Sequence, residues 1–146
     1  MQTRSGSTAR TDRSPSQYLA LVVGLVFTVA GIAGFFVTGF DFIEDFEQFF
    51  DPNTNQFLLG LEVNPAHNVV HLVLGLAGLA LGMSKAGARA YGALLFVGYA
   101  ATFVFGLFAV ENRDINFLSL NTADNWFHLA SALVGLVIAV LPGRRH

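Results

Sequence analysis

The chain contains no cysteine, and charged residues make up only 12% of it. Without cysteine there are no disulfides, thiolate nucleophiles or thiolate metal ligands. No serine–histidine–aspartate pattern, phosphate-binding glycine loop or pair of carboxylates within an apolar stretch is visible, which gives an enzyme little support. Hydrophobic residues account for 53% of the 146 residues. That balance is far from a soluble domain's and predicts a membrane protein.

Two long stretches carry no charge, Tyr18 to Phe40 and Ala90 to Val110. Each is long enough to cross a hydrocarbon core of roughly 30 Å at about 1.5 Å per residue. Two further spans follow if helices begin at Asn64 and near Asn121. The sequence therefore predicts an all-α, four-span bundle over residues 18–142, with spans at about 18–40, 64–83, 90–110 and 121–141. Residues 1–17, rich in Ser, Thr and Arg, are expected to be a disordered cytoplasmic tail.

The basic residues separate from the acidic ones along this pattern. Seven of the eight basic residues fall on one side of the predicted membrane. Arg113 falls on the other side, with nine of the ten acids. The other basic residues are Arg4, Arg10, Arg13, Lys85, Arg89, Arg144 and Arg145. Because Lys and Arg accumulate on the cytoplasmic side of spans, both termini are predicted to be cytoplasmic in a plasma membrane. A net charge of −2 gives no reason to expect nucleic-acid binding.

An internal repeat organises the chain. The segment NPAHNVVHLVLGLAGLALG, which begins at Asn64, returns 57 residues later as NTADNWFHLASALVGLVIA, which begins at Asn121. Chance similarity between apolar helices repeats leucine, whereas here Asn and His recur. We expect two parallel helical hairpins, residues 18–83 and 90–141, related by a pseudo-two-fold axis along the membrane normal.

Small residues at helical spacing are expected to let these helices approach one another closely. The residues predicted to pack in this way are Gly24, Thr28, Gly75, Gly78, Gly98, Thr102 and Gly135. After the first span, Phe42 to Phe50 place phenylalanines opposite acids at helical spacing. This pattern predicts one short helix lying flat in the membrane interface.

A polar stripe marks the start of the second and fourth spans. Asn64 before Pro65, and Asn121 three residues before Asp124, are typical helix caps. Facing one another across the pseudo-axis, the two stripes would form one pocket on the outer side. Its predicted members are Asn64, His67, Asn68, His71, Asn121, Asp124, Asn125 and His128.

Three interpretations of this pocket remain open. The first is structural: the side chains hydrogen-bond one another and fix the hairpins in a bundle of structural or accessory role, with no cofactor. The second is a small redox or metal-binding protein, with His67, His71 and His128 as ligands and Asp124 or Glu62 as a carboxylate. The third is haem, held axially by His71 and His128. A small-solute transporter ranks below these, because no charge lies in the middle of a span.

The runs GFFVTGF, NPAHNVVHLVLGLAGL and NTADNWFHLASALVGL resemble an uncharacterised bacterial membrane family catalogued as domain of unknown function 4383. The resemblance covers nearly everything from Tyr18 onward. It implies a four-span bacterial membrane protein and carries no known activity or functional residue. The expected surroundings are the lipid bilayer and either a membrane-protein partner or further copies of the chain.

Overall fold

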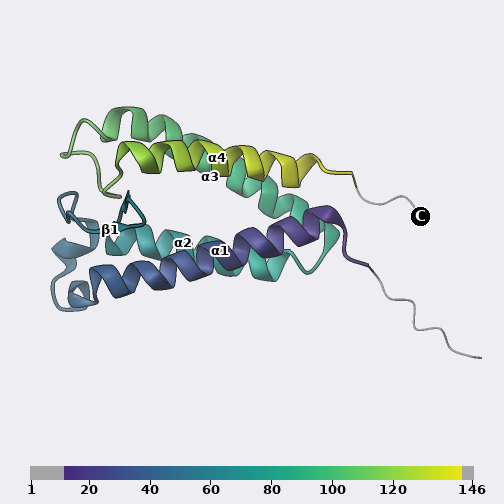
Figure 1. Cartoon of the computed structure of the whole chain (residues 1–146), viewed down its shortest axis with the longest axis horizontal. Coiled ribbons are helices and arrows are strands. Elements are labelled where there is room, and N and C mark those ends of the chain that lie inside the picture. The colour runs from purple at the N-terminus through teal and green to yellow at the C-terminus, as the bar shows by residue number, and fades with distance from the viewer. Residues whose placement is uncertain (1–11, 143–146) are drawn as a thin grey trace, which may run out of the picture.

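The computed structural model describes residues 12–142 and forms an all-α bundle (Figure 1). Its helices are α1 (Pro15–Thr38), α2 (Pro65–Leu81), α3 (Lys85–Ala109) and α4 (Thr122–Val140). The predicted fold class is confirmed. By length and composition α1, α3 and α4 can each cross a membrane. α2 is equally apolar but has 17 residues, or about 26 Å at 1.5 Å per residue.

The helix starts follow local capping chemistry. The Asn64 side chain accepts a hydrogen bond from the His67 amide at 2.9 Å, and Pro65 is the first helical residue of α2. At α4, Asn121 accepts from the Asp124 amide at 2.9 Å, while the Asp124 carboxylate accepts from the Asn121 amide at 3.0 Å. These reciprocal bonds satisfy backbone donors that a helix N-terminus leaves free. Both predicted caps are confirmed.

The two remaining helices begin earlier than expected. Ser14 caps α1 in a box with Gln17, so α1 takes in residues 15–17, which the sequence assigns to the tail, and the disorder of the tail stays a prediction. Ser84 caps α3, and Lys85 and Arg89 are therefore helical. Serine is a favoured N-cap, but Ser14 and Ser84 lie outside the charge-free stretches from which the span bounds are predicted. Residues 1–11 of the predicted tail, with Arg4 and Arg10, lie outside the described residues, as do Arg144, Arg145 and His146.

The connection after α1 contains two 3₁₀ helices, η1 (Asp41–Ile43) and η2 (Phe46–Phe50). The single interfacial helix predicted over this segment is wrong. Asp45 adopts an extended conformation and its carboxylate accepts from the Glu47 amide at 3.1 Å, which restarts the chain as a new turn. The phenylalanines still cluster, with the rings of Phe49 and Phe50 4.6 Å apart.

A small β-hairpin completes this connection. Strands β1 (Phe57–Leu58) and β2 (Leu61–Glu62) pair antiparallel through a two-residue turn. Leu59 and Gly60 both have positive φ, 55° and 87°, as such turns require. The hairpin leads straight into the Asn64 cap, so it fixes where α2 begins.

Glycines bring α1 onto α2 and α3 onto α4. A Cβ added to Gly24 would lie 2.7 Å from the backbone nitrogen of Leu79, and one on Gly135 would lie 2.6 Å from that of Phe96. Gly78 is equally crowded, and a Cβ on Gly75 would collide with Thr28. These positions require glycine because backbones meet there.

The packing role predicted for Gly98 is wrong, because a Cβ there would meet nothing within 4 Å. Thr102 also makes no bond to another helix: its hydroxyl donates to the Gly98 carbonyl of α3 itself, at 2.9 Å. In α3 the close contacts with α4 fall instead at Gly92 and Gly106. Gly98 and Thr102 have the same spacing as Gly24 and Thr28 of α1, but they do not occupy the equivalent position in the contact between helices.

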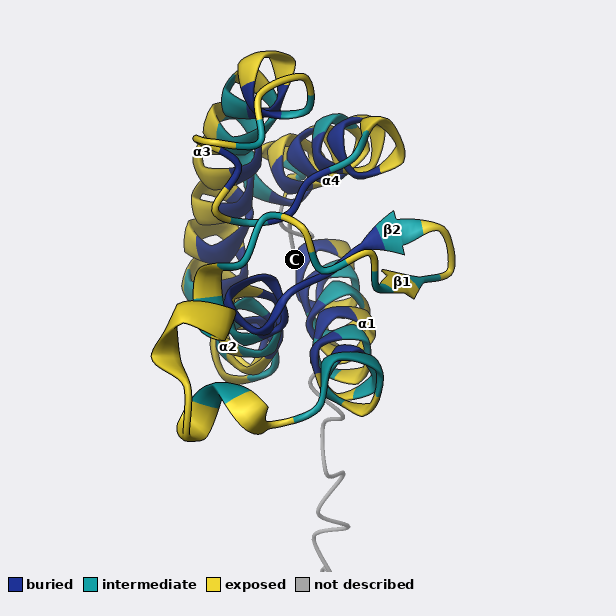
Figure 2. Ribbon diagram, turned by 90° about the vertical axis from the view of Figure 1, so that its left-hand side faces the viewer, coloured by how far each residue is buried: buried dark blue, intermediate teal, exposed yellow. Residues whose placement is uncertain are grey.

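The two hairpins lie side by side (Figure 1). The start of α1, the α2–α3 turn and the end of α4 are at one end, and the longer connections gather at the other. Viewed from the loop end, buried residues line the surfaces where helices face one another and exposed residues lie outward (Figure 2). The internal repeat stays a prediction, although the two hairpins share the glycine contacts described above.

Candidate functional site

Three histidines meet inside the bundle. α2 supplies His67 and His71, one helical turn apart, and α4 supplies His128. One ring nitrogen from each lies within 4.8 Å of the other two, and all three residues are buried. The ring centroids of His67 and His71 are 4.6 Å apart, and those of His67 and His128 are 5.8 Å apart. We call these residues the histidine cluster.

The nitrogens of this cluster have few partners. No hydrogen bond reaches Nε2 of His71 or Nδ1 of His128, although both are buried, and the ring of His67 has only the backbone of Glu62 and Leu118 near it as hydrogen-bond partners. Buried polar atoms in proteins are nearly always bonded, because leaving one unpaired costs about 1–3 kcal/mol. The imidazoles are therefore not mutually locked by hydrogen bonds, and their lone pairs and protons remain available to a ligand.

Two aromatic rings hold the cluster in place. Phe27 of α1 stacks on His71, with centroids 5.5 Å apart and planes 9° from parallel. Tyr99 of α3 stacks on His128 at 5.3 Å and 27°. Sequence reasoning missed Tyr99. Gly34 and Gly106 each contact an asparagine of the neighbouring helix, Asn68 and Asn125. When α1 and α3 are aligned on these two glycines, Tyr99 is the counterpart of Phe27, and this alignment would have identified it.

A cavity of about 130 Å³ adjoins the histidine cluster. All three histidines line it, and so does Tyr99, whose hydroxyl is buried without a partner. The remaining walls come from α2, α3 and the connection before α4: Val70, Leu74, Leu94, Leu95, Gly98, Thr102 and Leu118. The free imidazole nitrogens thus border a largely apolar space.

The predicted cap residues lie away from the cluster and join the loops. Asn64 donates to the carbonyls of Asp51 and Phe117, at 3.1 and 2.8 Å. Asn121 donates to the Gly60 carbonyl at 2.9 Å. The Asp124 carboxylate accepts from the Glu62 amide at 3.0 Å. Three of these bonds connect a loop of one hairpin to a helix start of the other, and the bond from Asn64 to Asp51 stays within the α1–α2 connection.

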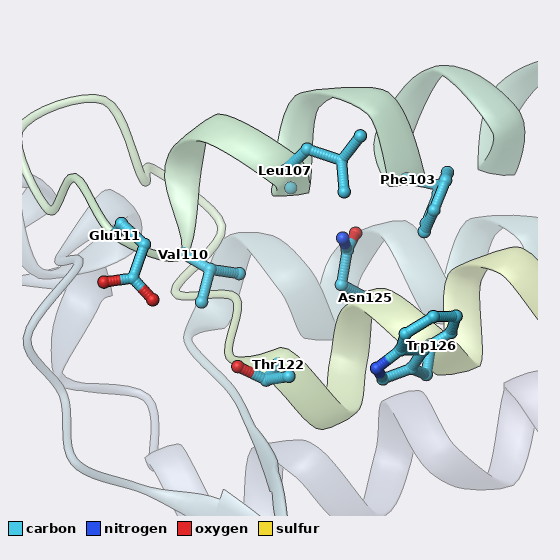
Figure 3. A pocket seen from close by; sticks show the side chains of 8 residues that line it. Phe103, Leu107, Val110, Glu111, Thr122, Asn125 and Trp126 are labelled. Atoms are coloured by element: carbon cyan, nitrogen blue, oxygen red, sulfur yellow. The ribbon is translucent and has the colours of Figure 1, made fainter.

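The other two asparagines serve the interfaces within each hairpin. Asn68 packs against Gly34 and donates to the Thr38 hydroxyl at 3.0 Å. Asn125 packs against Gly106 and points toward α3, where it lines a separate, partly open cavity of about 200 Å³ (Figure 3). The eight predicted residues therefore do not converge in one pocket. Helical periodicity placed them on one face but could not show that asparagine and histidine turn to different neighbours.

The carboxylates suggested as metal ligands are engaged elsewhere. Glu62 is 1% exposed and forms a two-pronged ion pair with Arg113, both N–O distances being 3.0 Å. The Ser119 hydroxyl donates to the same carboxylate at 3.1 Å, and Arg113 also donates to the Pro52 carbonyl. Among the described residues the cluster that could hold a metal contains histidine only. In the sequence, Arg113 is the one basic residue that falls with nine of the ten acids, and this isolation could have predicted the ion pair.

The histidine cluster fits a single metal ion but not haem. Metal–imidazole bonds of about 2.0–2.1 Å put ligand nitrogens about 3.3–3.6 Å apart, so side-chain rotations that bring them closer by up to about 1.5 Å would suffice. Imidazole nitrogens suit zinc, copper, iron and nickel. A porphyrin between His71 and His128 would need the space that the His67 ring occupies within 4.8 Å of both. The haem interpretation therefore does not fit.

The match to known proteins is at the level of the family. No curated protein and no solved structure matches the chain. The model of the family described as Domain of unknown function (DUF4383) matches residues 17–141. This range includes every residue of the histidine cluster and all four helices, apart from the first two residues of α1. The chain is a member of this family of unknown function.

Proposed function

We propose that this membrane protein binds one transition-metal ion through His67, His71 and His128. One observation carries the proposal: three buried imidazoles converge within 4.8 Å while Nε2 of His71 and Nδ1 of His128 have no hydrogen-bond partner. A purely structural cluster would be expected to pair these atoms. A metal ion bound by three imidazoles satisfies a lone pair on each ring at once.

The donor set favours zinc or copper. It is neutral and contains no carboxylate or thiolate, which disfavours the hard ions magnesium and calcium. Three protein ligands leave a fourth coordination position free, as in catalytic rather than structural zinc sites. Phe27 and Tyr99 would act as the shell that fixes the orientation of the ligand rings.

A structural role is the second candidate, and it is supported by other residues. The side chains of Asn64, Asn121 and Asp124 bond to loop backbone, including contacts between the two halves of the chain. They account for how the loop end is held together without requiring the histidines. A transporter has no such support, because charged residues in the described helices occur only in the first two turns, as Lys85, Arg89 and Asp124.

We further propose that all four helices cross a bacterial plasma membrane with both termini in the cytoplasm. The charge asymmetry supports this orientation, and the family resemblance supports the bacterial setting. The start of α1 and the end of α4 lie at the same end of the bundle, as an even number of spans requires (Figure 1). Under this proposal the histidine cluster lies toward the outer side.

Metal analysis of protein purified without a metal-binding tag tests the site. We expect close to one equivalent of zinc or copper in the wild type after growth in metal-replete medium. His67→Gln, His71→Gln and His128→Gln should each weaken binding by at least about 100-fold, because even the loss of an outer hydrogen-bond partner costs 10–100-fold. His146→Gln, which changes the remaining histidine, is the matched control and should bind as the wild type does.

Two outcomes would overturn the metal site. Less than a tenth of an equivalent in the wild type, even after incubation with zinc or copper, would leave the structural role alone. Equal loss of metal in the His146→Gln variant would mean that binding does not depend on the histidine cluster.

A further inference from the structure

The cavity beside the histidine cluster reaches the outside of the bundle between α2 and α3. Three of the residues that line it, Val70, Leu94 and Gly98, are exposed. Gly98 leaves the opening clear because a side chain there would meet nothing within 4 Å. In a membrane-spanning bundle, exposed apolar residues in the middle of α2 and α3 face lipid. The cavity therefore opens toward lipid rather than toward the loops.

We propose that this cavity is a binding site for a small neutral molecule that enters from the bilayer and binds to the free coordination position of the metal. The inference rests on the metal site proposed above and adds the class of its ligand. The imidazoles of His67, His71 and His128 all line the cavity. A ligand in this space would therefore lie next to the metal ion that they hold.

The walls determine the chemical class of the ligand. Apart from the three histidines, Tyr99, Thr102 and Gly98, they are Val and Leu side chains, and no Asp, Glu, Lys or Arg lines the cavity. An ion entering such a space would lose its hydration without compensation. At about 130 Å³ the cavity is slightly smaller than an engineered apolar cavity of about 150 Å³ that binds benzene. Diatomic molecules such as dioxygen, nitric oxide and carbon monoxide are neutral, dissolve in lipid and fit.

Tyr99 gives the site a polar contact for such a ligand. Its hydroxyl is buried, has no hydrogen-bond partner and belongs to a residue of the cavity wall. A hydroxyl at this place can donate to the far atom of a bound diatomic molecule. An aliphatic cavity formed only by imperfect packing would have no need of a buried hydroxyl, because a phenylalanine would fill the same space without the cost of an unpaired donor.

Carbon monoxide binding to the protein loaded with copper(I) is the direct test. Copper content is measured first, and the infrared stretching band of bound carbon monoxide is then titrated. We expect a single band in the wild type. Gly98→Leu should keep its copper and bind carbon monoxide at least about tenfold more weakly, because the side chain fills the entrance. Ala101→Leu, on an exposed position of α3 that does not line the cavity, is the matched control and should behave as the wild type.

The outcomes separate the two proposals. Protein that binds neither zinc nor copper overturns both the metal site and this inference, whereas protein that binds zinc but no copper overturns this inference alone. Protein that binds copper without a carbon monoxide band, or a Gly98→Leu variant with wild-type carbon monoxide affinity, overturns this inference alone. Gly98→Ala adds one methyl group at the same position and repeats the comparison with a smaller effect if leucine disturbs copper binding.

Discussion

Arg113 shows how one residue can join two loops. Its guanidinium holds Glu62 by two bonds and the Pro52 carbonyl by a third, so it ties the α3–α4 connection to the segment before α2. The carboxylate is 1% exposed, whereas the arginine side chain is 41% exposed. Loss of the arginine would therefore lower the free energy of unfolding mainly because the Glu62 carboxylate would stay buried without its charged partner.

Replacing Arg113 with methionine should destabilise the protein. The variant leaves the Glu62 carboxylate buried with Ser119 as its only side-chain partner. Breaking a fully buried pair costs about 3–5 kcal/mol, and since water reaches the arginine here we expect about 1–3 kcal/mol. Equilibrium unfolding in detergent measures this. Glu62→Gln combined with Arg113→Met should recover part of the loss; a double variant as unstable as the sum of the two single variants would contradict the pairing.

At the residue scale the sequence separates histidine from asparagine only in part. The spacing of His67 and His71 and the recurrence of His128 were sufficient to single out all three residues of the cluster. Asp124 is not among the residues whose ligand atoms converge, and its Oδ2 accepts from the Asn121 and Glu62 amides at the helix start. Cap and ligand roles use the same atoms, and only the direction of the side chain decides between them.

The helices show which glycines are required by packing. At Gly24 a Cβ would lie 2.7–2.9 Å from backbone atoms of α2, whereas at Gly98 it would meet nothing. We therefore expect Gly24→Ala to lower the free energy of unfolding by about 1–3 kcal/mol through overpacking. Gly98→Ala should leave it unchanged or raise it by up to about 1 kcal/mol, because alanine favours the helix.

The same detergent unfolding experiment compares the two glycine variants directly. Each introduces one methyl group into a helix interior, so differences in helix propensity cancel between them. Equal effects on stability would mean that α1 and α2 do not meet at Gly24, and the close approach of the two helices in each hairpin would then be in doubt.

The elements were predictable where local chemistry determines them. Asn64 with Pro65, and Asn121 with Asp124, mark helix starts by their own side chains, and apolar length marks the four helices. The segment from Asp41 to Phe50 was predicted as one helix because its phenylalanines recur at helical spacing, yet it forms two 3₁₀ turns. In so short a segment the stacking of the rings on one another, as between Phe46 and Phe49 at 5.6 Å, competes with helical propagation.

On the scale of the whole molecule, the loop end is fastened by polar bonds and the helical body by small residues. Hydrogen bonds from Asn64 to Phe117 and from Asn121 to Gly60 link the two halves of the chain at that end. Further in, Gly24 and Gly135 allow backbones to touch. The histidine cluster lies between α2 and α4, which belong to different halves. Metal binding would therefore add a connection between the hairpins where backbone contacts are fewest.

The orientation of the whole chain can be tested because it has no cysteine, so a single introduced thiol has no background. Asp114→Cys lies at an exposed position of the α3–α4 connection, and Met83→Cys lies at the exposed turn between α2 and α3. With both termini in the cytoplasm, a membrane-impermeant maleimide added to intact cells should label Asp114→Cys and should reach Met83→Cys only after permeabilisation. The reverse pattern would invert the proposed orientation and place the histidine cluster toward the cytoplasm. Labelling of both variants in intact cells would place both sites outside the membrane. In that case α3, which lies between them, would not cross the membrane, and the four-span arrangement would have to be abandoned.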